Sequence, residues 1–191
     1  MVVLLPSKQV VRVRFPYSAP NKMTIIYLIG LYVFVVFLLS RLVIPLMGFR
    51  MYKIPKELPE EMLVKVKGLE GQSQTAEEFL KKTYDFVQSR WHAERLKTVV
   101  KFPLIFRTDL EQLWQAPGYA HCTTINYIFV CMLANSKFFT AENLKVRHVF
   151  FNGVPHQYVK VRLNGRWLDL DPSLSYVIGI PFGQRTRKWF G

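Results

Sequence analysis

Acidic residues are missing from the first 50 positions of this 191-residue chain, which hold six Lys or Arg side chains. The whole chain has 26 basic and 13 acidic residues, for a formal net charge of +13. A basic excess suits anionic lipid headgroups or nucleic acid. The sequence holds no nucleic-acid-binding motif, and its basic residues flank an apolar segment. We therefore expect the membrane lipid bilayer, and not nucleic acid, as a partner.

Cysteine is scarce, since the chain contains Cys122 and Cys131 only. Within one predicted helix they lie about 13 Å apart, which is too far for a mutual disulfide. Two thiols exclude a disulfide framework. No Cys-x-x-Cys or His-x-x-x-His spacing occurs, so the sequence does not favour zinc and predicts neither a metal nor a cofactor.

Charge is absent from residues 23–40, and the apolar run continues past Arg41 to residue 49. A helix of this length approaches the thickness of a bilayer core, roughly 30 Å. The segment lacks the polar stripe of a buried core helix and the cleavage site of a signal peptide. We therefore predict a basic tail at 1–22, a transmembrane helix at 23–47 and a linker at 48–72. The localisation expected is a single-pass membrane protein, whose orientation the flanking charges leave undetermined.

Residues 73–191 read as one α+β domain, with helices first and antiparallel strands after them. A capping-box pattern begins at Thr75, and residues 122–134 form an uncharged, apolar helix. Strands are predicted at 145–151, 156–163 and 166–170, separated by the turn signals Asn152-Gly153 and Asn164-Gly165.

Three residues of this domain have the types needed for a thiol nucleophile. Cys122 begins the apolar helix, where backbone N–H groups and the helix dipole favour a thiolate. His156 opens a strand, and Asp171 follows the next strand, so the two can lie side by side. Asp169 is a competing carboxylate that strand alternation places on the same face as Asp171.

Residues 75–173 resemble the transglutaminase-like superfamily, which has a papain-like core. The resemblance rests on three blocks in order: residues 118–122 (GYAHC), 146–149 (VRHV), and a His strand from His156 that is followed by Trp167 and Asp171-Pro172. It implies Cys122 as nucleophile, His156 as general base and acid, and Asp171 as the residue that orients the imidazole. Ala120, Tyr158 and His121 depart from the residues common in that family.

The expected function is that of a membrane-anchored cysteine enzyme that performs acyl transfer or hydrolysis on amide bonds of protein or peptide substrates. An oxyanion donor is required. The candidates are the backbone N–H of Cys122 and the side chains of Gln112, Trp114 and Gln115. The alternative is a catalytically inactive scaffold that acts as a membrane-tethered binding module.

Overall fold

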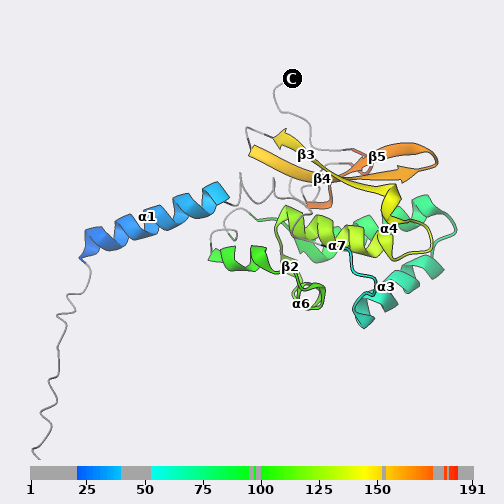
Figure 1. The fold of residues 1–191 in the computed structure, drawn as a ribbon, viewed down its shortest axis with the longest axis horizontal. Coiled ribbons are helices and arrows are strands. Elements are labelled where there is room, and N and C mark those ends of the chain that lie inside the picture. Colours follow the sequence, from blue (N-terminus) through cyan, green and yellow to red (C-terminus); the bar gives the residue numbers. More distant parts are fainter. Residues whose placement is uncertain are drawn as a thin grey trace, which may run out of the picture.

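The structure, a computed structural model, describes residues 21–39, 53–94, 97, 100–151, 154–173, 179 and 181–184. Over these residues the chain forms a small α+β domain with five α-helices and two sheets (Figure 1). Helices α3, α4, α6 and α7 lie on one side of a three-stranded sheet in Figure 1, with α7 nearest to it, whereas α1 lies apart from the sheet. The helices are α1 (Lys22–Leu38), α3 (Glu60–Gly71), α4 (Ala76–Arg90), α6 (Leu110–Gln115) and α7 (Cys122–Ala134).

The three-stranded sheet is antiparallel, in the order β3 (Leu144–Phe151), β4 (Val154–Leu163) and β5 (Arg166–Leu170). Asn164 and Gly165 both have positive φ angles, 51° and 80°, as a two-residue type I′ hairpin turn requires. This confirms the predicted strands and the second turn. The predicted turn at Asn152-Gly153 lies outside the described residues.

Helix α7 is the centre of the core, because twelve consecutive residues from Cys122 to Leu133 are all buried. It packs between α4 and β4. The Thr75 side chain caps α4 by accepting the backbone N–H of Glu78 at 3.1 Å. Both helices were predicted, one from its cap and the other from its lack of charge.

The predicted linker 48–72 is wrong over residues 60–71, which form helix α3. Met62, Val66 and Leu69 are spaced by four and three residues, so one face of α3 enters the core. The glycines and prolines around it suggested a connector, but burial of this apolar face outweighs their weak helix propensity. Residues 60–71 therefore belong to the folded domain.

The short segments before α7 also form regular structure. Residues 102–106 form a 3-10 helix, and Asp109 caps α6 by accepting the backbone N–H of Gln112. Two-residue strands β1 (Trp91–His92) and β2 (Gly118–Tyr119) pair in parallel. Pairing across so long a separation leaves no local sequence signal.

Helix α1 contradicts the predicted transmembrane helix at 23–47. It has 17 residues, which corresponds to about 25 Å, short of the roughly 30 Å of a bilayer core. Within the part of the chain that the structure describes, no helix combines the length and apolarity that a membrane span needs. Residues 40–47 of the predicted span lie outside that part. The prediction of a single-pass transmembrane protein is therefore wrong, and the localisation that was based on this span is not supported.

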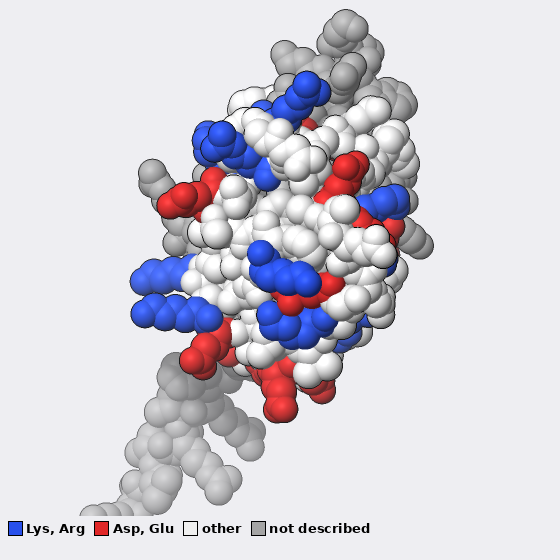
Figure 2. All heavy atoms as spheres, turned by 90° about the vertical axis from the view of Figure 1, so that its right-hand side faces the viewer, with Lys and Arg blue, Asp and Glu red and all other residues white. Residues whose placement is uncertain are grey.

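Charged side chains on the domain do not form a single basic field on the face drawn in Figure 2. There Lys and Arg side chains alternate with Asp and Glu side chains. Several of the basic groups pair with acidic neighbours on the same helix, including Lys81 with Asp85 at 2.7 Å and Lys82 with Glu78 at 2.8 Å. This surface therefore mixes both signs of charge.

Candidate active site

Cys122 is the first residue of α7, and its side chain is buried in the domain. The unpaired N–H groups and positive dipole end of a helix favour an anion at this position. Cys131 lies nine residues later in the same helix, where burial raises the pKa of its thiol to about 12. The two cysteines therefore differ chemically, because one lies at the start of α7 and the other inside it.

A buried imidazole and carboxylate lie close to Cys122. His156 Nε2 and Asp171 Oδ2 are 2.8 Å apart, with His156 8% exposed and Asp171 fully buried. The second carboxylate oxygen, Oδ1, accepts the Ser173 hydroxyl at 2.9 Å. Both oxygens of Asp171 are thus engaged, so the carboxylate has a fixed orientation toward the imidazole.

The structure distinguishes between the two carboxylates that the sequence left open. Asp169 lies opposite Lys160 in the β4–β5 ladder and forms an ion pair with it at 3.2 Å. Asp171 follows the last residue of β5, and its carboxylate is the one that contacts His156. The predicted Cys122, His156 and Asp171 are therefore brought together, whereas Asp169 is not part of this cluster.

The electrostatics of the cluster favour a thiolate and an imidazolium. Burial opposes ionisation of Cys122, but the side chains of His121 and then His156 lower the pKa of its thiol well below the usual value. Burial likewise disfavours a charged His156, but Asp171 and Cys122 raise its pKa to about 10. Because Nε2 of His156 faces Asp171, Nδ1 is the ring nitrogen left for the sulfur.

A buried amide ties the two elements that carry the thiol and the imidazole. Asn126, one turn after Cys122, donates its Nδ2 to the backbone oxygen of Gln157 at 2.9 Å, and both residues are fully buried. Gln157 is the neighbour of His156 in β4. This bond therefore fixes the start of α7 against β4. Sequence reasoning missed Asn126, although a polar residue inside an otherwise apolar helix is a usable signal.

The chain just before Cys122 is held by β1 and an aromatic cluster. Ala120 donates its N–H to the backbone oxygen of His92 at 3.1 Å, which extends the β1–β2 contact. Trp91 of β1 packs on Trp114 with ring centroids 5.5 Å apart, and Arg90 stacks 4.4 Å above the Trp114 ring. These contacts define the approach of the chain to Cys122.

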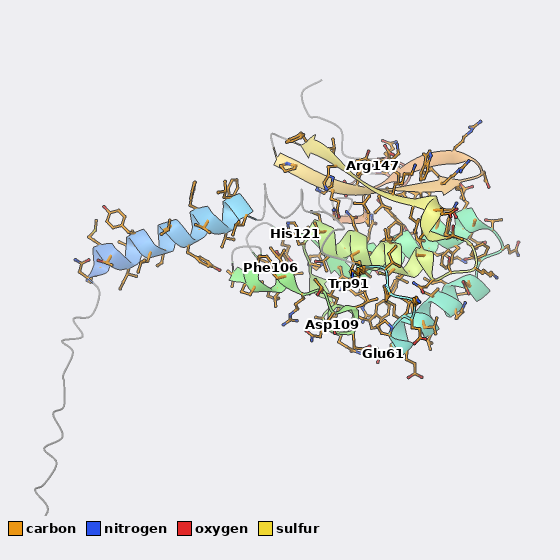
Figure 3. All side chains as sticks on the ribbon, viewed as in Figure 1. Glu61, Trp91, Phe106, Asp109, His121 and Arg147 are labelled. Atoms are coloured by element: carbon orange, nitrogen blue, oxygen red, sulfur yellow. The ribbon has the colours of Figure 1, made fainter. Side chains whose placement is uncertain are left out.

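A pocket opens beside the first turn of α7. Its wall is mostly apolar and comes from Trp91, the 3-10 helix at 102–106 and α6, and it reaches His121 and Thr124. Figure 3 shows His121 at the start of α7, and it shows Phe106 and Trp91 on the side of α7 that faces away from the three-stranded sheet. Arg147 lies on the sheet, in an exposed position of β3. The pocket therefore adjoins the residues on either side of the thiol.

Two of the predicted side-chain oxyanion donors have partners elsewhere in the domain. Gln115 Nε2 donates to Glu61 and Glu111, at 3.1 and 3.2 Å, and Trp114 is part of the aromatic cluster. The backbone N–H of Cys122 remains a candidate. Among the described residues, no group of three or more His, Cys, Asp and Glu side chains is placed to hold a metal ion.

Comparisons of this chain with protein families, with characterised proteins and with solved structures give no match. The resemblance to the transglutaminase-like superfamily therefore rests on its sequence motifs and stays a prediction. The geometry does not depend on that resemblance. It consists of a thiol at a helix start and an imidazole hydrogen-bonded to a buried carboxylate, with the thiol and the imidazole perturbing each other's pKa.

Proposed function

We propose that this protein is a cysteine enzyme that transfers the acyl group of an amide to water or to an amine. Cys122 is the nucleophile, His156 the general base and acid, and Asp171 the residue that orients His156. The observation that carries the proposal is the 2.8 Å contact between His156 and the buried Asp171, with the other side of the imidazole toward a thiol of lowered pKa. A nucleophile, a base and a group that holds the base form the arrangement that covalent acyl transfer needs.

In the acylation step the Cys122 thiolate attacks the carbonyl carbon, and a C–S bond forms. The carbonyl oxygen becomes an oxyanion, which the backbone N–H of Cys122 at the start of α7 would stabilise. As the intermediate collapses, the C–N bond breaks. His156, which is held as an imidazolium by Asp171, gives its proton to the departing amine nitrogen. The product is a thioester on Cys122 and a neutral His156.

In the deacylation step His156 takes a proton from water or from an incoming amine. The resulting nucleophile attacks the thioester carbon, a C–O or C–N bond forms, and the C–S bond breaks. Cys122 leaves as a thiolate and His156 is again an imidazolium, so the starting state is restored. Water gives hydrolysis and an amine gives transamidation. We propose amides of proteins or peptides as substrates, with an apolar group of the substrate in the pocket beside His121.

The first test compares the two cysteines within one protein. Iodoacetamide should alkylate Cys122 at mildly acidic pH, whereas Cys131, with a raised pKa and no exposed surface, should stay unmodified. Peptide mapping by mass spectrometry distinguishes the two sites. The variant His156→Ala should slow alkylation of Cys122 at that pH. Equal, slow labelling that does not depend on His156 would contradict the proposed nucleophile.

The second test follows acyl transfer itself. p-Nitrophenyl acetate should release a burst of p-nitrophenolate and leave an acetyl group on Cys122, which intact-protein mass spectrometry detects. Added methylamine then separates the two outcomes, because N-methylacetamide forms only if an amine can resolve the thioester. Cys131→Ser is the matched control and should retain the burst. If the protein folds and Cys122 is reactive but no acyl-enzyme forms, the domain is an inactive scaffold and the proposal fails.

A further inference from the structure

A second histidine touches the sulfur of Cys122. His121 is the N-cap of α7, and its Nδ1 lies 3.6 Å from Cys122 Sγ. The same nitrogen lies 3.0 Å from the Thr123 hydroxyl oxygen and 3.5 Å from the Thr123 backbone nitrogen. The side chain of His121 is 9% exposed. The cluster therefore contains two imidazoles around one thiol.

Two roles are compatible with this position. As a neutral ring with an unprotonated Nδ1, His121 accepts the Thr123 N–H and caps the helix. With a proton on Nδ1, it can donate to the sulfur and to the Thr123 oxygen instead. Helix capping alone does not require histidine, because Ser, Thr, Asp and Asn are the preferred N-cap residues. The choice of an imidazole next to the thiol is what needs a reason.

We propose that His121 is a second hydrogen-bond donor to the Cys122 thiolate, so that the nucleophile is held by two imidazoles and not by His156 alone. The inference rests on Cys122 being the nucleophile of the proposed function, and it goes beyond the three residues that act there. His121 contacts the reacting sulfur, whereas Asp171 acts through His156. The two imidazoles approach from different elements, the loop before α7 and strand β4.

The surroundings of His121 are compatible with this role. His121 is the first cause that lowers the pKa of Cys122, ahead of His156. The ionisable groups around the pair are His156 from β4, Asp171 after β5, and Arg107 and Tyr119, which line the same pocket as His121. A thiolate in a buried cluster that also contains the Asp171 carboxylate needs partners that donate hydrogen bonds or carry positive charge, because buried charges are tolerated in a protein only when they are paired.

The test is the pH dependence of Cys122 alkylation by iodoacetamide, between about pH 4 and pH 9. His121→Ser keeps a strong N-cap but removes the imidazole. We expect the midpoint of the alkylation profile to rise by about one pH unit, so that the rate below both midpoints falls about tenfold. His148→Ser, at an exposed position of β3, is the matched control and should reproduce the wild-type profile.

A His121→Ser profile that superimposes on the wild-type profile would overturn the inference and leave His121 as a helix cap only. His121→Asn, which also keeps a capping oxygen, provides a second variant if the serine variant does not fold, as judged by thermal unfolding. The double variant His121→Ser/His156→Ala should lose the alkylation of Cys122 that each single variant retains. The two proposals can also fail separately. If the wild-type protein forms no acetyl-enzyme but His121→Ser still shifts the alkylation profile, acyl transfer is refuted and the hydrogen bond from His121 to the Cys122 thiolate is supported.

Discussion

Replacement of Asp171 by Asn tests the core of the site with the smallest change in shape. Asn has nearly the same volume and can still accept one hydrogen bond, but it carries no charge. In the wild-type protein the fully buried carboxylate accepts from His156 Nε2 at 2.8 Å and from the Ser173 hydroxyl at 2.9 Å. The substitution therefore removes the anion that stabilises the imidazolium and leaves the packing around it in place.

The size of the effect follows from the lost charge-assisted hydrogen bond. Such bonds contribute about 1.5–3 kcal/mol, and about 1.4 kcal/mol corresponds to one pKa unit. The pKa of His156, which Asp171 and Cys122 raise to about 10 against the effect of burial, should thus fall by roughly one to two units. The thiolate–imidazolium pair should become about 10- to 100-fold less favoured relative to the neutral pair.

The assay is the rate at which a peptide p-nitroanilide releases p-nitroaniline as a function of pH, because this amine leaving group needs the proton of His156. Thermal unfolding is the check on the fold. Because the pKa of His156 is raised in the folded protein, the imidazolium exists below that pKa and is lost as the pH rises through it. In Asp171→Asn this alkaline limb should move to lower pH. Asp169→Asn is the matched control, since Asp169 forms a partly exposed ion pair with Lys160, whereas Asp171 is the carboxylate that pairs with His156. An unchanged profile for Asp171→Asn, or an equal shift for Asp169→Asn, would refute the assignment.

Three further substitutions probe the support of the site and the domain. Ser173→Ala should slow acylation about 3- to 30-fold, because it removes a hydrogen bond to the carboxylate, and the burst assay measures this. Asn126→Ala should lower the free energy of unfolding in urea by about 1–3 kcal/mol, because the buried carbonyl of Gln157 loses its donor. Burial opposes ionisation of Glu70, but the Lys137 backbone N–H and the Lys67 ammonium lower its pKa. The ionised Glu70 should therefore contribute fully to the free energy of unfolding above about pH 4.3, and this contribution should be lost as the pH falls through the lowered pKa. Glu70→Gln should remove that part of the pH dependence, which urea unfolding at neutral and acidic pH would show.

The elements predicted best are those whose signals are local. Helix α7 has the predicted bounds, because thirteen residues without charge favour a buried element, and Cys122 begins it. The β4–β5 hairpin follows from Asn164-Gly165, since few other residue pairs adopt two positive φ angles. Helix α3 was missed although Met62, Val66 and Leu69 have helical spacing, because nearby Gly and Pro residues obscured it.

The site was predictable in its residue types but not in its supporting contacts. Strand alternation could not separate Asp169 from Asp171, because β5 ends at Leu170 and the alternation of faces does not extend beyond a strand. The hydrogen bond from Asn126 to the carbonyl of Gln157 joins residues 31 positions apart, so no local sequence pattern predicts it. The apolar run at 23–40 misled for the opposite reason: composition measures apolarity, whereas spanning a bilayer also requires length in one helix, and α1 ends at Leu38.

Charge balance connects the triad to the second imidazole. When Cys122 is a thiolate, the buried cluster holds two anions, the thiolate and the Asp171 carboxylate, and His156 supplies one cation between them. One negative charge is left over, and an uncompensated buried charge is costly. The N-terminal end of α7 offsets only part of it, because a helix dipole acts as about half an elementary charge. The His121 imidazole, whose Nδ1 lies 3.6 Å from the sulfur, is placed to supply a second hydrogen bond to this anion. The same reasoning gives the order of sensitivity: loss of either imidazole should raise the pH at which Cys122 reacts, and loss of both should leave the buried thiol protonated at neutral pH.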